Sequence, residues 1–186
     1  MSEIKYWSDI DWQRSSTERL FHALSDAIKA IQQEIDEAEE DYQIERGLDH
    51  TENLLGIAFI VAQTYIVGVV SETLRIVKPT LKPTKESLLR DYSDQISGSS
   101  STQMELCNAI ANYFKHHDEW ANWSVPGRHR RTVAVLVSVG IQEDEAFPCA
   151  KAAEILSINS ADAGLEPLLT LITQWRQIVI QANRRE

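Results

Sequence analysis

The segment TERLFHALSDAIKAIQQEIDEAEEDYQIER, residues 17–46, decides the fold class. Its apolar residues recur at intervals of three and four, which is the repeat of one face of an α-helix. They are Leu20, Leu24, Ala27, Ile28, Ile31, Ile35, Ala38 and Tyr42. The Ser-Ser-Thr sequence at 15–17 can cap the beginning of this helix, and Gly47 can end it. The spacing therefore predicts one long amphipathic helix that ends just before Gly47.

A second long helix is predicted directly after Gly47. Residues 49–51 are of the types that cap a helix, and Pro79 ends the pattern that they begin. Because only a short turn separates the two helices, they are expected to pack against each other as an antiparallel hairpin. This hairpin is the predicted centre of the fold.

The middle of the second helix, LLGIAFIVAQTYIVGVV at residues 54–70, is apolar nearly all round. That composition indicates a helix with packing partners on several sides. The run is shorter than the ~20 residues that span a bilayer, and polar residues at 63–65 interrupt it, so a buried core helix is predicted instead of a membrane span. Gly56 and Gly68 are expected to mark the close approach of neighbouring helices, since glycine weakens an exposed helix.

The rest of the chain predicts shorter helices. The predicted segments are 84–96, 100–120, 132–139, 149–158 after Pro148, and a last helix beginning at Ser160 or Asp162. Residues 132–139 fit a strand as well, but no other segment looks like a pairing partner. The expected fold class is all-α, a bundle of about six to seven helices built on the hairpin. One domain is expected, with an N-terminal arm (1–15), a core bundle (16–140) and C-terminal helices (141–186).

Composition limits the classes of function. Hydrophobic residues make up 43% and charged residues 25% of the chain, as in ordinary soluble proteins. The net charge of −10 argues against general affinity for nucleic acid or an anionic membrane, so any nucleic acid would need a local basic patch. Cys107 and Cys149 lack the spacing of a zinc site and predict buried free thiols. The N-terminal sequence is not a signal peptide, and a cytoplasmic protein is expected.

The segment MELCNAIANYFKHHDEWANW, residues 104–123, carries the candidate chemistry. On a helical wheel one face is apolar and is expected to be buried, with His117 among its residues as a core histidine. The residues of that face are Leu106, Cys107, Ile110, Tyr113 and Phe114. The opposite face is polar, with His116 at its border. Its residues are Asn108, Asn112, Lys115 and Glu119.

A catalytic or phosphate-binding site is predicted on this polar face. Asn112 lies one turn before His116, so the two side chains can meet. His116 is the obvious general acid or base, because an unperturbed histidine titrates near neutral pH. Cations nearby could hold a phosphate group. The predicted phosphate-binding residues are Lys115, Arg128, Arg130 and Arg131. A simple solvated surface accounts for the same pattern and stays open as an alternative.

The motif Asn112-Tyr-Phe-Lys-His116, late in an all-helical chain and after a long hairpin, resembles the HEPN superfamily (higher eukaryote and prokaryote nucleotide-binding domains). Members are helical bundles, often dimeric, and many are ribonucleases in toxin–antitoxin or phage-defence systems. The resemblance implies catalysis by Asn112 and His116, RNA or a nucleotide as ligand, a homodimer, an antitoxin-like protein partner and no cofactor. The family signature begins with an Arg, where this chain has Ala111. A non-catalytic dimeric interaction module of the same fold is therefore the alternative.

A third hypothesis is a metal-dependent all-α phosphohydrolase. Glu34, Glu37 and Glu40 put carboxylates on neighbouring helical turns, and the His-His-Asp sequence at 116–118 offers further ligand types. No second helix has a matching Glu-x-x-Asp pair, and a solvated acidic face is the favoured explanation of the cluster. No metal site is therefore predicted. The tryptophans of the N-terminal arm, at positions 7 and 12, add to the expectation of a homodimer.

Overall fold

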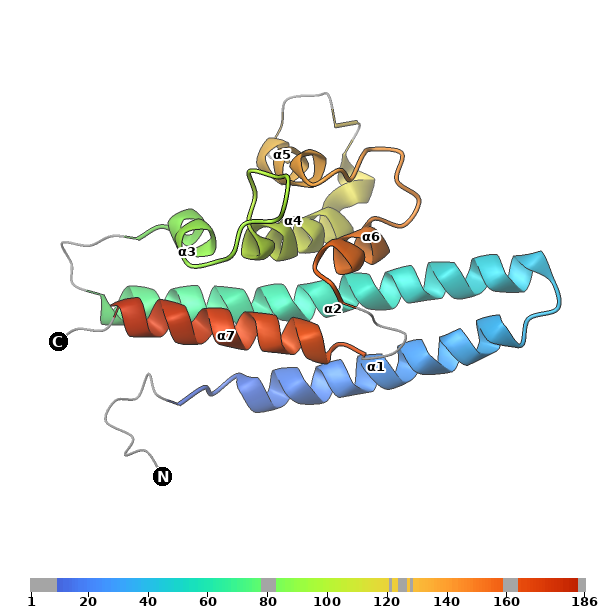
Figure 1. Cartoon of the computed structure of the whole chain (residues 1–186), viewed down its shortest axis with the longest axis horizontal. Helices are drawn as coiled ribbons and strands as arrows, with labels where there is room; N and C mark the ends of the chain where they lie inside the picture. Colours follow the sequence, from blue (N-terminus) through green and yellow to red (C-terminus); the bar gives the residue numbers. More distant parts are fainter. Residues whose placement is uncertain are drawn as a thin grey trace.

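The computed structural model describes residues 10–77, 83–120, 122–123, 127, 129–158 and 164–183. Within these ranges the protein contains seven α-helices and no β-strand apart from one isolated bridge between Gln95 and Thr102. The predicted all-α fold class is confirmed. The hairpin at its centre consists of α1 (Arg14–Asp36) and α2 (Asp41–Ile76), which run antiparallel side by side (Figure 1).

The turn of this hairpin lies earlier in the chain than predicted. It falls at residues 37–40, whereas the sequence pattern placed it at Gly47. The side-chain oxygen of Gln43 accepts hydrogen bonds from the backbone amides of Glu39 and Glu40, each at 3.1 Å, and so satisfies donors at the beginning of α2. Because these amides are paired here, α2 begins at Asp41 and continues through Gly47.

Gly47 is buried inside α2 and has a different role from the predicted one. A Cβ atom at this position would lie 2.4 Å from Cγ1 of Ile35 on α1. The glycine therefore permits the two helices to approach each other near the turn, and does not end a helix. Gly56 also permits the close approach of a helix, as predicted, since a Cβ atom there would lie 2.2 Å from the ring of Phe114 on α4.

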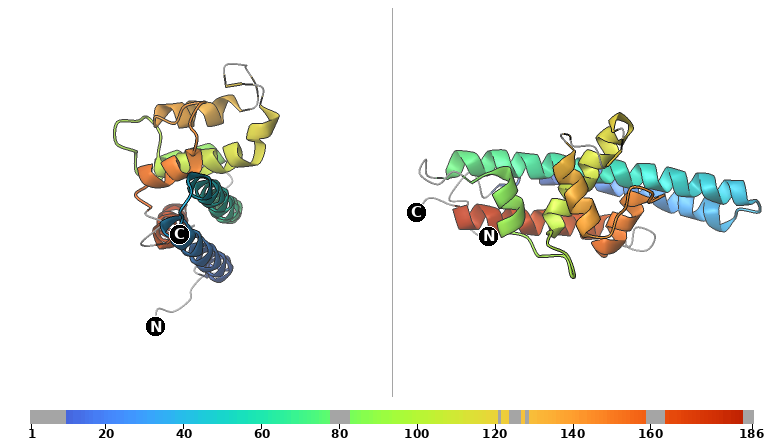
Figure 2. Two further views of the ribbon diagram at one scale, coloured as in Figure 1. Left: turned by 90° about the vertical axis from the view of Figure 1, so that its right-hand side faces the viewer. Right: turned by 90° about the horizontal axis from the view of Figure 1, so that it is seen from above.

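Helix α2 is the element on which the other helices pack. In Figure 2, α1 and α7 lie beside or below α2, α4 crosses above it, and α5 lies above α4. The remaining elements have the following bounds: α3 (Lys85–Asp91), α4 (Gln103–His116), the 3₁₀ turn η2 (His117–Glu119), α5 (Arg130–Ser138), α6 (Pro148–Ile155) and α7 (Glu166–Asn183).

The apolar run at residues 54–70 of α2 is mostly buried in the core, as predicted. Its fully buried side chains include Phe59 and Ile66, which belong to the same cluster as Ile110 of α4 and Trp175 of α7. By length and composition alone α2 could cross a membrane, but more than half of its most apolar window is buried in the bundle. That burial is typical of a core helix in a soluble protein.

Several predicted boundaries shift while the elements remain. Residues 132–138 are helical, as favoured for the segment 132–139, and Pro148 lies in the first turn of α6. The helix predicted over 84–96 ends at Asp91. The central helix begins only after Thr102, whose hydroxyl accepts a hydrogen bond from the amide of Glu105 at 3.3 Å. The predicted beginning of the last helix lies outside the described residues.

Both cysteines are buried free thiols, as predicted. Burial raises the pKa of Cys107 to about 12 and also raises the pKa of Cys149. Of the predicted N-terminal arm the structure describes only the part from Ile10, in which Trp12 is 66% exposed. Trp7 lies outside the described residues.

Candidate anion-binding site

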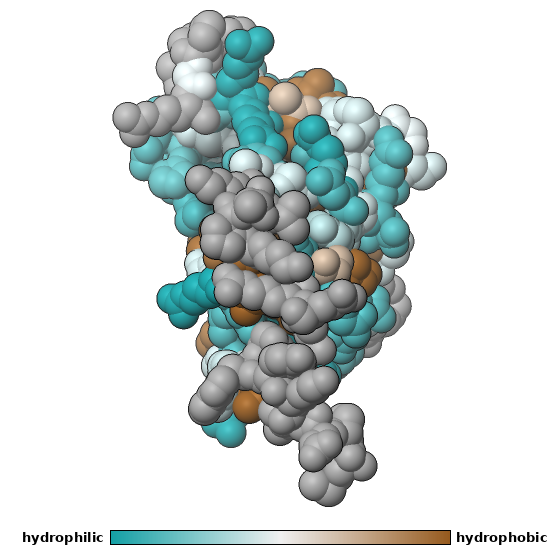
Figure 3. Space-filling model, turned by 90° about the vertical axis from the view of Figure 1, so that its left-hand side faces the viewer, coloured by the Kyte–Doolittle hydropathy of each residue, from teal (hydrophilic) through white to brown (hydrophobic). Residues whose placement is uncertain are grey.

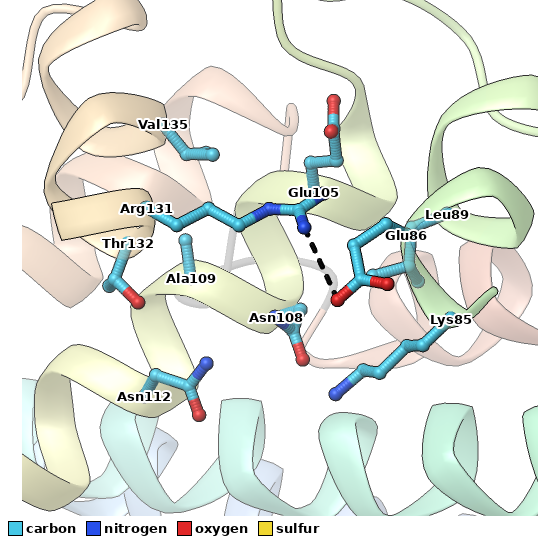
Figure 4. Close-up of a pocket in the computed structure, with 10 residues that line it drawn as sticks. All are labelled: Lys85, Glu86, Leu89, Glu105, Asn108, Ala109, Asn112, Arg131, Thr132 and Val135. Atoms are coloured by element: carbon cyan, nitrogen blue, oxygen red, sulfur yellow. Dashed lines mark ion pairs between the residues drawn. The ribbon is translucent and has the colours of Figure 1, made fainter. Parts of the chain in front are cut away.

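A pocket of about 210 Å³ opens where α3, α4 and α5 meet (Figure 4). Its lining combines charged, polar and apolar side chains. The lining residues are Lys85, Glu86, Leu89, Glu105, Asn108, Ala109, Asn112, Arg131, Thr132 and Val135. The end of the molecule at which α3 lies is mostly hydrophilic in its upper part, where α3 and α5 lie (Figure 3). We call this hollow the anion pocket because of the charges described below.

Helix α3 brings Lys85 and Glu86 to the rim of the anion pocket. The hydroxyl of Thr84 accepts a hydrogen bond from the amide of Ser87 at 3.1 Å, and this cap fixes the first turn of the helix. Leu88 and Leu89 are buried in the core and hold the short helix in place. The two charged residues of the first turn are thereby fixed beside α4 and α5.

The floor of the anion pocket rests on a buried glutamine of α2. Gln63 donates from Nε2 to the side-chain oxygens of Asn108 at 3.0 Å and Asn112 at 2.9 Å, and its Oε1 accepts from Nζ of Lys115 at 2.5 Å. Because Gln63 occupies both asparagine oxygens, the amide nitrogens of the two asparagines remain available as donors. Figure 4 shows that the Asn112 nitrogen is directed toward the pocket.

Positive charge exceeds available negative charge around the anion pocket. Burial, followed by the positive charges of Lys115 and Arg131, lowers the pKa of Lys85, although the carboxylate of Glu86 acts in the opposite direction. Burial also lowers the pKa of Lys115. The only ion pair drawn across the pocket joins Nη1 of Arg131 to Oε1 of Glu86 at 3.2 Å (Figure 4). In a chain of net charge −10, two cations line the pocket and Lys115 lies near it on Gln63, whereas Glu86 is the one lining carboxylate that is not held by a residue outside the pocket.

The second carboxylate of the lining, Glu105, is engaged elsewhere. Its Oε1 accepts from Arg90 at 2.9 Å, and its Oε2 accepts from the amide of Thr102 at 3.1 Å. Glu86 is ionised readily, because a hydrogen bond from its own backbone amide and the guanidinium of Arg131 lower the pKa of its side chain. A ligand with a compact negative group would therefore compete with Glu86 for the cations Lys85 and Arg131.

The structure brings together three of the residues predicted from the sequence. Asn112 and Arg131 line the anion pocket, and Lys115 reaches it through Gln63. Arg130 precedes Arg131 at the beginning of α5 and is exposed, while Arg128 lies outside the described residues.

His116 is paired with a different residue from Asn112. Its Nδ1 lies 3.3 Å from Oε1 of Glu119, and its side chain is about half exposed. Asn112 instead points its side-chain oxygen at Gln63. Asn112 and His116 thus do not pair with each other as predicted: His116 pairs with Glu119 at the end of α4, and Asn112 pairs with Gln63 further back along the helix.

The prediction that His117 is a core histidine is wrong. Its side chain is 41% exposed, its Nε2 lies 3.1 Å from Asp118, and its ring stacks on Tyr113 with centroids 5.1 Å apart. The physical reason is that α4 ends at His116 and the chain continues as the tighter turn η2. A wheel drawn at 3.6 residues per turn no longer applies at that point.

Lys85, Glu86 and Gln63 were not found from the sequence, although two signals pointed to them. Lys85 is a cation in the first turn of a helix, where the helix dipole disfavours positive charge. Gln63 is an amide within an otherwise apolar run. Such departures from local rules often mark functional positions.

No group of three or more His, Cys, Asp or Glu side chains that could hold a metal ion comes together within the ranges that the structure describes. The acidic residues near the hairpin turn, from Glu34 to Asp41, are all exposed. No family model, curated protein or solved structure matches this chain.

Proposed function

We propose that this protein binds a phosphate-bearing ligand, an RNA or a nucleotide, in the anion pocket. The observation that carries the proposal is the placement of Lys85 and Arg131 on either side of a pocket whose floor offers amide donors. Charge-assisted hydrogen bonds from lysine and arginine are the usual means of holding phosphate. This reading keeps the phosphate-binding role of Lys115 and Arg131 and adds Lys85.

The size of the anion pocket favours recognition of one or two phosphate groups over enclosure of a large ligand. At about 210 Å³ it is smaller than the range of ~300–1,000 Å³ typical of pockets that enclose a drug-sized molecule. The rest of an RNA or nucleotide would then lie over the exposed surface of α5, where Arg130 is available. A cytoplasmic setting is part of the proposal, since such ligands and reduced thiols occur there together.

Fluorescence anisotropy with a labelled single-stranded RNA, competed by adenosine monophosphate, tests this function. The matched variants are Lys85→Gln in the anion pocket and Lys29→Gln on the exposed face of α1, which make the same change of charge. We expect Lys85→Gln to weaken binding about tenfold, as for loss of one charge-assisted hydrogen bond, and Lys29→Gln to leave it unchanged. Equal binding by the two variants, or no binding by the wild type, would contradict the proposal.

Ribonuclease activity at His116 is the second candidate. The Glu119 carboxylate beside Nδ1 can orient the imidazole and leave Nε2 for a substrate. Ala111, at the position where the HEPN family has its Arg, is fully buried, so an Arg there would need space that the core does not offer. The reaction would instead need a cation from the anion pocket. RNA cleavage that His116→Ala abolishes would support this activity. A defence or toxin–antitoxin role is proposed with it from the resemblance to the HEPN superfamily.

A further inference from the structure

One face of α2 is exposed although it carries no charge. Residues 53–71 contain no Asp, Glu, Lys, Arg or His, a stretch of about 27 Å at the helical rise. Along this stretch Ile57 is 42% and Val67 44% exposed. In a chain with 25% charged residues, an uncharged exposed face of this length is typical of an interface.

The residues of this face follow the spacing of a helix–helix seam. They alternate at intervals of four and three, which is the 3.5-residue repeat of helices that pack along their length. They are Asn53, Ile57, Ile60, Thr64, Val67 and Ser71. Ile60 is half-buried and the other five are exposed. We call them the α2 seam. The other sides of α2 contact α1, α4, α6 and α7.

The α2 seam reads the same from both ends. Its intervals of four, three, four, three and four are symmetric about the point midway between Ile60 and Thr64. A two-fold axis at that point would pair Ile57 with the partner's Val67, and Asn53 with the partner's Ser71. Two of the three kinds of pair would then be matched in polarity, apolar with apolar and polar with polar, as suits a self-complementary interface, while Ile60 at the centre would meet the partner's Thr64.

The charges that flank the α2 seam obey the same symmetry. Asp49 and Arg75 are exposed and lie equally far from its midpoint, one before the seam and one after it. An antiparallel partner would set Asp49 against the partner's Arg75 at both ends of the seam. A parallel partner would set like charges together at both ends, which is unfavourable.

We propose that the α2 seam is the interface of a homodimer in which the α2 helices of two copies pack antiparallel. This interface is independent of the anion pocket and of the function proposed for it. It also differs from the expectation that the N-terminal tryptophans join the subunits.

Sedimentation velocity of the full chain over a range of concentrations tests this interface. We expect the wild type to sediment as a dimer and Ile57→Glu as a monomer, because a buried carboxylate without a partner is costly. Ile178→Glu is the matched control, since Ile178 on α7 is 51% exposed and lies off the seam. A monomeric wild type, or a dimer that Ile57→Glu leaves intact, would overturn the proposal.

A charge exchange tests the antiparallel arrangement without touching the apolar residues. Asp49→Arg and Arg75→Asp should each weaken the dimer roughly tenfold, because each creates two like-charge contacts. The double variant Asp49→Arg with Arg75→Asp should restore wild-type affinity. Failure of the double variant to restore affinity while both single variants weaken it would exclude the antiparallel pairing, even if Ile57→Glu does not fold.

Discussion

Two clusters of charged side chains lie on opposite faces of α2, and they differ in whether their charges are balanced. One is the anion pocket above Gln63. The other, the Arg176 cluster, joins Arg176 of α7 to Glu72 at 3.0 Å and to Asp11 at 3.8 Å, with Tyr65 donating to Asp11. Gln63 and Glu72 are two and a half helical turns apart, so they point in opposite directions.

The Arg176 cluster is closed, because its cation has two carboxylates and a carbonyl around it. Arg176 is 7% exposed and also donates to the carbonyl of Ile10 at 3.1 Å. Burial and the hydrogen bond to Asp11 raise the pKa of Tyr65, so the phenol stays neutral. In the anion pocket, by contrast, Lys85 has the cations Lys115 and Arg131 as neighbours, and the carboxylate of Glu86 is shared with Arg131. The difference indicates that the first cluster stabilises the fold and the second is open to a ligand.

The largest expected effect comes from Arg176→Met. It removes the cation but keeps much of the side-chain volume, leaving Glu72 and Asp11 without their partner. We expect the free energy of unfolding to fall by about 3 kcal/mol, at the lower end for a broken buried ion pair because both carboxylates keep some contact with water. Chemical denaturation measures the change, with Arg19→Met on the exposed face of α1 as control. If Arg176→Met loses no more stability than Arg19→Met, the Arg176 cluster does not stabilise the fold and the contrast with the anion pocket fails.

The same substitution in the anion pocket should behave differently. Lys85→Met removes a cation that burial and its neighbours already disfavour, so we expect stability to stay within about 1 kcal/mol of the wild type. Affinity for a phosphate ligand should nevertheless fall about tenfold. Denaturation and ligand titration of one preparation give both values. A large loss of stability together with unchanged affinity would show that Lys85 is structural, like Arg176.

Glu86→Gln should change the affinity for phosphate by less than Lys85→Met does, and in the opposite direction. The carboxylate of Glu86 competes with a ligand for Arg131, and its removal frees the guanidinium. We expect affinity for phosphate to rise a few-fold, consistent with an ion pair between half-exposed groups. Isothermal titration calorimetry with inorganic phosphate measures it, and Glu154→Gln on α6 is a control outside the pocket. Weaker binding by Glu86→Gln would mean that Glu86 itself helps to hold the ligand.

The pH dependence of binding should be the smallest of these effects. A bound anion favours charged Lys85, whereas the free pocket lowers the pKa of this side chain from 10.5. Affinity for sulfate, whose own charge does not change, should therefore fall as the pH rises through the lowered pKa, below the range in which an ordinary lysine loses its proton. The dependence in this window should be weaker in Lys85→Gln. An equal pH dependence in both proteins would assign it to another group.

The sequence predicted those features that depend on local repeats. The spacing of Leu24, Ile28 and Ile31 sufficed for the first helix, and the absence of a pairing partner identified residues 132–139 as helical. The hairpin turn was misplaced because Gly47 looked like a helix end. Its real role, close packing on Ile35, depends on a contact between two helices that a single segment does not reveal.

The candidate site was predicted only in part for the same reason. Asn112 and Lys115 share a face of α4 and could be found from the helical repeat, and Arg131 stood out as part of a basic cluster. Lys85 and Gln63 come from α3 and α2, and only tertiary packing brings them to α4. His117 was misplaced because the change from α4 to η2 leaves little signal in the sequence.

The most direct test of the central claim is an NMR titration of isotope-labelled protein with adenosine monophosphate. We expect the largest amide shifts at Lys85, Asn112 and Arg131, little change around Arg176, and loss of the shifts in Lys85→Gln. Shifts centred on the Arg176 cluster, spread evenly over the surface, or unchanged in Lys85→Gln would contradict the account of the anion pocket.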